Sequence, residues 1–528
     1  MSEDRSRIVT RRDFLFLAAA TGSAWLIAPQ ASRATPRVGQ AEPFSFERLV
    51  QQARELAARP YSPRPRPAAE VVARLDYDAV QNIQYRPEES LWAGMPERSP
   101  VRFFHLHRLA PEPVRIYAVE NGEAREVLYD PGLFDLDIGE LADGLPEDLG
   151  FAGFRLMDPE RRPTDWLAFQ GASYFRTSGE AGQYGLSARG IAIDTATAGA
   201  EEFPAFTAFW LEPSDGDPGA MRIHALLDGP SVAGAWRFDV RLDGGVTMDV
   251  RSEMFFRRRV ERLGLAPLTS MYWFGENQPR AEADWRPEVH DSDGLAIWTG
   301  AGERIFRPLT NPPAVRLHSF VDDDPKGFGL VQRDRDFDHY LDDGAFYDRR
   351  PSLWVEPLDG WGEGAVQLLE IPTDDEVHDN IAVFWAPARR PEAGDRLSLG
   401  YRLHWRNRQP YPPEAVASVI ATRTGRAGRP GESQPDSPLR RKFVIDFRGG
   451  PLSAMDARFD IEPVVTLSGG EVSDSYVVNV VGTDIWRAAF DVEFFGAEGV
   501  DMRCYLRLGE RTLTETWLYH HFPLGRAT

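Results

Sequence analysis

Two clusters of acidic residues could do chemistry in this chain. The first is Glu288-Val289-His290-Asp291-Ser292-Asp293, and the second is Thr373-Asp374-Asp375-Glu376-Val377-His378-Asp379. The Gly, Pro, Ser and Asn residues around them predict that both lie in loops. Two carboxyl groups from separate loops are the minimum for glycoside hydrolysis, in which one protonates the leaving oxygen and the other activates water. A calcium site or simple solvation would give the same pattern.

Tryptophans are concentrated around these clusters. Six of the fourteen in the chain are Trp273, Trp285, Trp298, Trp354, Trp361 and Trp385. Indole faces suit the CH-rich faces of sugar rings, and the indole NH can meet a hydroxyl group. Any single tryptophan is better explained as a core anchor of a strand, but the group indicates a groove for a sugar chain.

The charge of the chain restricts its ligands. The 528 residues carry a formal net charge of −21. Such a field disfavours nucleic acid and anionic lipid headgroups, and it is compatible with a neutral sugar or a cationic ligand. We therefore expect no nucleic-acid partner.

Motifs for other enzyme classes are missing from the sequence. It has no Gly-x-Ser-x-Gly elbow, no His-Glu-x-x-His helix and no complete dinucleotide-binding glycine motif. Cys504 is the only cysteine, so the chain forms no internal disulfide, and the alternation around it predicts a buried strand position. His520-His521 is interpreted as a surface pair. We expect no metal site and no cofactor.

The elements that must position these residues are mostly strands. Apolar residues at helical spacing predict a helix over residues 46–57, which Pro60 ends. After residue 80 the period changes to two, and Asn121-Gly122 and Asp243-Gly244-Gly245 are typical of hairpin turns. The sequence therefore predicts a mainly β fold, a large sandwich of antiparallel sheets.

Residues 1–34 are predicted to be a twin-arginine export signal. Arg11-Arg12 precedes an apolar run that ends near Ser32-Arg33-Ala34, a small-x-small cleavage site. The run is too short and interrupted for a membrane anchor. We expect cleavage after Ala34, a periplasmic location and no stable membrane insertion.

A second boundary is predicted at residues 407–413. The run Asn407-Arg408-Gln409-Pro410-Tyr411-Pro412-Pro413 and the Gly, Pro and Ser-rich stretch Thr424–Pro438 argue against a continuing sheet. They predict a large domain over 35–406 and a smaller domain over 414–528, whose short strands favour an immunoglobulin-like sandwich.

Several longer runs then identify a family. They include Gly171-Ala172-Ser173-Tyr174-Phe175-Arg176, Tyr184 to Gly190, Trp285 to Leu295, and Glu370-Ile371-Pro372-Thr373-Asp374-Asp375-Glu376. From about residue 42 to 522 the chain resembles the OpgG/OpgD family of periplasmic glucan biosynthesis proteins. A twin-arginine leader is typical of its D subfamily.

The resemblance implies a fold and an activity. It implies a galactose-mutarotase-like N-terminal β-sandwich, an immunoglobulin-like C-terminal domain, and a role in making osmoregulated periplasmic glucans with a β-1,2-linked backbone. Members are understood as inverting β-1,2-glucanases. By motif, Asp379 would be the general acid, Asp291 the water-activating end of a proton path, and Glu376 a member of the same network. Candidates for contact with the glucan are Tyr272, Trp273, Asp293, Trp298, Arg307, Tyr347 and Trp354.

Two other functions stay open at this point. The chain could be a scaffold that binds nascent glucan for a membrane glucan synthase without cleaving it. It could also be a branching transglycosidase, in which a sugar acceptor replaces water. A homodimer is considered as well, although no heptad repeat or exposed apolar stripe supports it.

Overall fold

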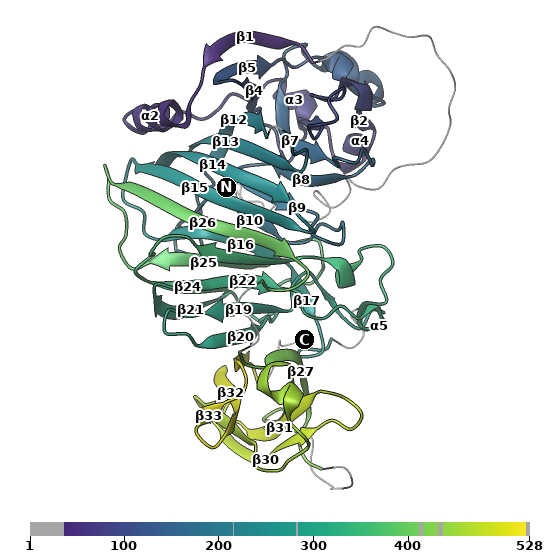
Figure 1. Cartoon of the computed structure of the whole chain (residues 1–528), viewed down its shortest axis with the longest axis vertical. Coiled ribbons are helices and arrows are strands. Elements are labelled where there is room, and N and C mark those ends of the chain that lie inside the picture. The colour runs from purple at the N-terminus through teal and green to yellow at the C-terminus, as the bar shows by residue number, and fades with distance from the viewer. Residues whose placement is uncertain are drawn as a thin grey trace, which may run out of the picture. The chain divides into compact units, whose positions relative to one another are not determined.

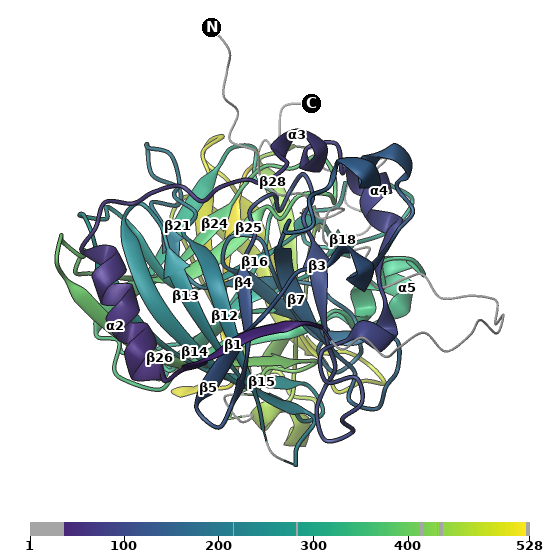
Figure 2. The same cartoon turned by 90° about the horizontal axis from the view of Figure 1, so that it is seen from above.

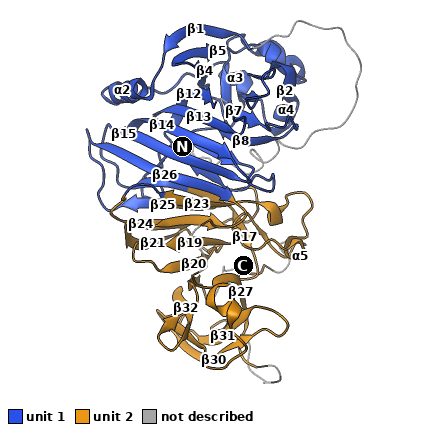
Figure 3. Cartoon of the chain, in the orientation of Figure 1, with its two compact units in different colours: residues 1–267, 357–359, 384–405 blue, residues 268–356, 360–383, 406–528 orange. Residues whose placement is uncertain are grey.

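The computed structural model of the protein describes residues 36–214, 216–280, 284–410, 415–429, 431 and 437–523. The predicted export signal lies outside these residues. The chain divides into two compact units (Figure 3): unit 1 has residues 1–267, 357–359 and 384–405, and unit 2 has residues 268–356, 360–383 and 406–528. Within the described ranges, no helix has the length and apolar character needed to span a bilayer.

Unit 1 is built mainly of antiparallel strands. One sheet has neighbours in the order β1 (Val38–Pro43), β5 (Glu123–Val127), β4 (Arg115–Glu120), β12 (Ala205–Pro213), β13 (Ala220–Asp228), β14 (Val232–Leu242) and β15 (Val246–Phe256), followed by β26 (Arg396–Arg406) (Figure 1). A second order is β10 (Ser187–Arg189), β9 (Tyr174–Thr177), β8 (Asp165–Gln170), β7 (Phe151–Met157) and β3 (Val101–His105). The β4–β12 pair is parallel.

Smaller elements complete unit 1. Its other strands are β2 (Ile83–Tyr85), β6 (Phe134–Leu136) and β11 (Ala192–Ile193), and its short helices are α3 (Ala69–Val72), α4 (Tyr77–Gln81), η1 (Pro87–Glu89), η2 (Pro131–Leu133) and η3 (Gly139–Gly144). Strands β16 (Leu263–Ser270) and β25 (Ile381–Pro387) contribute residues to both units.

The predicted helix is present as α2 (Phe46–Ala57). It begins at Ser45, whose hydroxyl accepts a hydrogen bond from the Arg48 backbone N–H at 3.3 Å. Its buried residues Leu49 and Ala53 pack in a core cluster with apolar residues of β12 to β15. Figure 2 shows the helix beside β13 and β14.

Both predicted hairpins are confirmed. Asn121 and Gly122 connect β4 to β5 with φ values of 52° and 78°. Gly244 and Gly245 connect β14 to β15 with φ values of 74° and 148°. Positive φ at consecutive turn positions explains why glycine stands there.

Unit 2 has one sheet with neighbours in the order β23 (Ser352–Pro357), β22 (Gly327–Val331), β19 (Gly294–Trp298), β20 (Arg304–Pro308), β34 (Thr516–His521), β32 (Val500–Leu508) and β29 (Glu462–Leu467). Four more strands pair in the order β27 (Ser418–Arg426), β28 (Arg440–Arg448), β31 (Trp486–Glu493) and β30 (Glu471–Asn479). Shorter pairings join β17 (Tyr272–Phe274) to β18 (Val289–His290), β21 (Arg316–Asp323) to β24 (Glu363–Glu370), and β33 (Arg511–Thr512) to β32. The helices are α5 (Phe337–Tyr340), η4 (Tyr347–Arg349) and η5 (Gly450–Ala454).

The C-terminal strands share a core with the sheet that precedes them in sequence. Phe306 and Trp354 pack in one cluster with Phe443, Trp486 and Trp517. Cys504 is fully buried in the same cluster, as predicted, and burial raises the pKa of its thiol to about 12. Residues 415–523 therefore belong to one compact unit with residues 268–356.

The coarse fold prediction is confirmed, because the described chain is mainly β with antiparallel sheets. The finer likenesses to galactose mutarotase and to immunoglobulin domains stay predictions, as does the division at residues 407–413, part of which lies outside the described residues. One local expectation was wrong. Strand β27 runs to Arg426 and so enters the Gly, Pro and Ser-rich stretch, where its pairing with β28 supplies the backbone partners.

Candidate active site

The loop that carries Asp291 is anchored to the segment Thr269–Tyr272. The Asp291 backbone N–H donates to the Met271 carbonyl at 2.9 Å. The neighbouring hydroxyl of Ser292 lies 2.9 Å from that of Ser270. Both contacts are in the buried interior of unit 2, so Asp291 is held in place by the backbone next to it.

The loop that carries Asp379 is anchored to the same segment. The Asn380 side chain accepts from the Tyr272 N–H at 2.8 Å and donates to the Tyr272 carbonyl at 2.9 Å. It also donates to the Ile371 carbonyl at 2.9 Å, which closes the loop on itself. The Thr269 hydroxyl donates to Asp379 Oδ2 at 3.5 Å. Two loops that are distant in sequence therefore converge on four consecutive residues.

Asp291 is fully buried and forms an ion pair. Its Oδ1 accepts a hydrogen bond from Arg350 Nη1 at 2.5 Å, and the Arg350 side chain is 1% exposed. Arg350 also donates to the Ala345 carbonyl at 2.8 Å and 3.1 Å. A buried carboxylate that loses water needs such a partner, so Arg350 is what allows the buried Asp291 to be anionic.

Tyr347 connects this ion pair to Glu376. The Arg350 guanidinium lies 4.5 Å from the centre of the Tyr347 ring, and the Tyr347 hydroxyl donates to Glu376 Oε2. Arg286 Nη1 donates to the same oxygen at 3.0 Å and to Asp342 Oδ2 at 2.5 Å. The network therefore runs from Asp291 to Glu376 through one aromatic ring.

The charge of Arg350 links the two predicted catalytic groups. Burial lowers the pKa of Arg350 from its ordinary value, and the nearby Tyr347, Glu376 and Asp379 oppose this. Arg350 is thus in hydrogen-bond contact with Asp291 and within the electrostatic reach of Asp379.

An acidic pocket lies in unit 2. It is lined by Tyr272, Glu276, Glu288, His290, Asp293 and Asp334 together with Asn277, Phe306, Pro308 and residues 420–422. Burial raises the pKa of Glu276 to about 7, although Arg423 opposes the shift. The lining includes two of the predicted glucan contacts but neither Asp291 nor Asp379.

Tyr272 and Asp293, the two predicted glucan contacts in the pocket lining, are held firmly in place. Tyr272 is buried, stacks on His290 with a ring separation of 5.4 Å, and donates its hydroxyl to Asn277. Asp293 Oδ2 accepts the backbone N–H groups of Arg333 and Asp334 at 2.7 Å and 2.9 Å. Burial raises the pKa of Asp293.

The other predicted contacts lie in different surroundings. Trp273 belongs to the same buried cluster as Tyr347 of the network. Trp298 is half-buried between Arg304 and Lys326, whose cationic groups lie 4.4 Å and 5.3 Å from its ring. The remaining two are buried: Trp354 packs in the core, and Arg307 pairs with Glu370 at 3.2 Å.

Several contacts of the site were not predicted from the sequence. Arg350 lies 59 residues from Asp291, and Arg286 lies 90 residues from Glu376. No spacing rule marks either arginine as the partner of a carboxylate. Glu288 and His290 stood in the first cluster, yet their pairing at 3.0 Å was not expected.

Comparisons with known proteins identify the family of the chain. The family described as "Periplasmic glucan biosynthesis protein, MdoG" matches residues 44–521. The chain is 48% identical to "Glucans biosynthesis protein D 2" of Ralstonia nicotianae, with 98% of each chain covered. It is 47% identical to "Glucans biosynthesis protein D" of Xanthomonas oryzae pv. oryzae, with 93% and 92% covered, and 47% identical to the protein of that name in Stenotrophomonas maltophilia, with 97% and 98% covered. The predicted resemblance, including the likeness to the D subfamily, is confirmed.

Proposed function

The chain belongs to the MdoG family of periplasmic glucan biosynthesis proteins, and we propose on that premise that it is an inverting endo-β-1,2-glucanase. It shortens the glucan backbone in the periplasm, which it reaches by the twin-arginine route. The observation that carries the proposal is the convergence of the Asp291 and Asp379 loops on residues 269–272. A glycosidase needs two carboxyl groups from separate segments at one bond.

Asp379 acts as the general acid. It is half-buried, and it donates its proton to the oxygen that bridges two glucose units. Because this proton must be replaced after every cleavage, a group with some access to solvent suits the acid role. The Asn380 contacts with Tyr272 hold the loop while the proton is transferred.

Asp291 is the base end of the proton path. The ion pair with Arg350 favours its anionic form, so it can receive a proton from the attacking water. Asp291 is fully buried, and the proton therefore travels through an intervening water or side chain. Tyr347 and Glu376 lie along such a route. Attack opposite to the leaving group gives the α-anomer first.

The test is cleavage of linear β-1,2-glucan by the purified protein, followed by chromatography and polarimetry. We expect shorter products that appear first as α-anomers. Asp379→Asn should lower kcat by roughly 10²- to 10⁴-fold, the usual contribution of a general acid. The matched control is Asp374→Asn in the same loop, because the Asp374 side chain is 91% exposed. It should behave like the parent.

Other outcomes would reject the proposal. Unchanged turnover in Asp379→Asn would remove it as the general acid. Saturable glucan binding without cleavage would favour the scaffold for a membrane glucan synthase. Products with a new linkage would favour the branching transglycosidase.

A further inference from the structure

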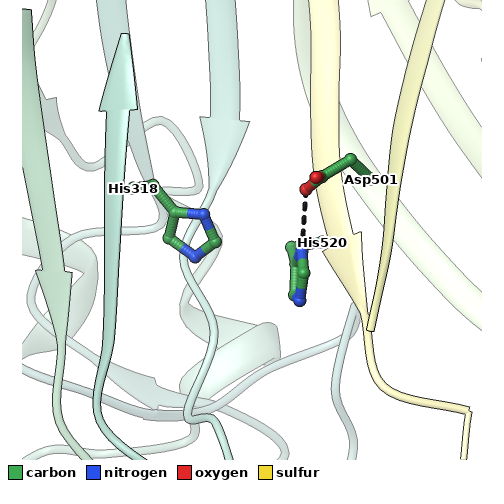
Figure 4. Close-up of side chains that lie close together, drawn as sticks. All are labelled: His318, Asp501 and His520. Atoms are coloured by element: carbon green, nitrogen blue, oxygen red, sulfur yellow. Dashed lines mark hydrogen bonds and ion pairs between the residues drawn. The ribbon is translucent and has the colours of Figure 1, made fainter. Parts of the chain in front are cut away.

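Two imidazole rings and one carboxylate from three strands of unit 2 face one another (Figure 4). They belong to His318 on β21, Asp501 on β32 and His520 on β34. Each offers a ligand atom, and these atoms all lie within 4.8 Å of one another. Asp501 and His520 are directly opposite in the antiparallel β32–β34 register, so the sheet itself keeps this pair together.

The surroundings decide which nitrogen of His520 is available. A Cβ at Gly499 would lie only 2.2 Å from His520 Nε2, so that edge of the ring is covered by the backbone of a residue without a side chain. The other nitrogen, Nδ1, lies 2.7 Å from Asp501 Oδ1. His520 therefore presents Nδ1 to the cluster.

His318 lies next to a buried carboxylate. Its Nε2 is 3.4 Å from Glu370 Oε2. Glu370 is itself fixed, because Thr310 donates to its Oε1 from the backbone at 2.7 Å and from the hydroxyl at 2.9 Å. Arg307 completes its partners at 3.2 Å. A carboxylate behind an imidazole is the usual support of a metal-binding histidine.

We propose that His318, Asp501 and His520 bind a divalent transition-metal cation, with Zn²⁺ as the best match. Two imidazole nitrogens and one carboxylate oxygen are ligands that this ion prefers, and three protein ligands leave one position for water. The cation takes the place of the proton between His520 Nδ1 and Asp501, and this proton passes to solvent. Asp501 can turn to make room, since its side chain is 74% exposed.

The site would join β21 to the β32–β34 pair. Strand β21 ends its sheet order, so one of its edges is not paired with any other described strand. A cation bound by His318 on β21 and by Asp501 and His520 on β32 and β34 stabilises the folded state, and the gain in free energy of unfolding grows with the ratio of free cation concentration to Kd. The inference does not depend on the proposed glucanase activity, and it replaces the expectation of no metal site. His521 points elsewhere, since its ring stacks on Phe494 at 4.9 Å.

The experiment is titration of the chelator-treated full protein with ZnCl₂, followed by calorimetry and thermal unfolding. The parent should bind one equivalent and gain melting temperature. His318→Ala and Asp501→Asn should each weaken binding at least ~10-fold, because each removes a ligand. Glu370→Gln should weaken it by roughly 10- to 100-fold, although Glu370 is not itself a ligand of the metal.

The matched control is His339→Ala. His339 belongs to the other group of described residues with metal-ligand spacing, together with Glu288 and Asp334. Its variant should bind like the parent. The proposal is overturned if the parent binds no Zn²⁺, if Asp501→Asn binds as tightly as the parent, or if His339→Ala loses the bound equivalent. Asp501→Asn decides the matter even if His318→Ala fails to fold, because Asp501 is on the surface.

Discussion

The two acidic clusters have similar compositions but occupy different environments. In the first cluster Glu288, His290 and Asp291 are buried, and each has a fixed partner. In the second cluster Asp374 is 91% exposed and Glu376 is 37% exposed. One cluster is therefore part of the interior, and the other remains in contact with solvent.

Burial allows similar acidic residues to take different roles. A buried carboxylate beside a guanidinium keeps its charge, because the cation replaces the water that it has lost. A carboxyl group on a solvated loop can exchange its proton with water. The contrast is compatible with the proposed roles of Asp291 as the base end and Asp379 as the acid, and it can be tested through stability as well as activity.

The largest effect should come from Asp291→Asn. The variant leaves the Arg350 cation buried without its anionic partner, and removing one partner of a buried ion pair costs about 3–5 kcal/mol. Denaturant unfolding measures the loss in the free energy of unfolding. The control is Asp379→Asn in the second cluster, which should cost less than about 1 kcal/mol. Equal losses in the two variants would contradict the contrast between the clusters.

The next effect is a pH dependence from Glu276, which shares the acidic pocket with Glu288 and Asp293 of the first cluster. Its pKa is about 7 in the folded protein and about 4.3 in an unfolded chain. Below pH 4.3 its contribution is fully present. It is lost as the pH rises from about 4.3 to about 7, because over this range the unfolded state has released its proton while the folded state still holds it.

The loss should be on the order of 3 kcal/mol in the free energy of unfolding. Unfolding curves recorded at several pH values measure it. In Glu276→Gln this part of the pH dependence should disappear. A variant with the same pH profile as the parent would show that the pocket leaves Glu276 as an ordinary surface acid.

A smaller loss in the free energy of unfolding is expected from Tyr347→Phe, because Tyr347 lies between Arg350 and Glu376. Tyr347→Phe removes the hydroxyl that donates to Glu376 but keeps the ring that lies against Arg350. The loss should be about 1.5 kcal/mol, the lower end for a hydrogen bond to a charged group. A double-mutant cycle with Glu376→Gln measures the coupling. Fully additive losses would mean that the hydroxyl does not connect the clusters.

The smallest effect is expected at the exposed Asp374. Asp374→Asn should change the free energy of unfolding by less than about 0.5 kcal/mol, since its contact with Arg280 spans 3.8 Å at the surface. Thermal unfolding at low and moderate salt checks this. A loss comparable to that of Asp291→Asn would remove the distinction between the clusters.

Features that depend on neighbours in sequence were predictable. The helix Phe46–Ala57 followed from its apolar spacing, and the turns at Asn121-Gly122 and Asp243 to Gly245 followed from the φ values that they require. The burial of Cys504 followed from strand alternation. The family was also evident from runs in the sequence, as the comparisons later confirmed.

Features that depend on partners distant in sequence could not be predicted. Nothing near Trp354 distinguishes it from a groove residue, yet it is fully buried beside Phe443 and Trp517. His520 resembled a surface residue until the β32–β34 register placed it opposite Asp501 and the fold brought His318 to them.

Local patterns in the chain were enough to predict the mainly β character, the turns, the family and the two acidic clusters. Which cluster is buried depends on the folded protein, where Arg350 lies against Asp291. Local pattern controls backbone conformation, whereas the environment of a charge depends on the groups that folding brings around it.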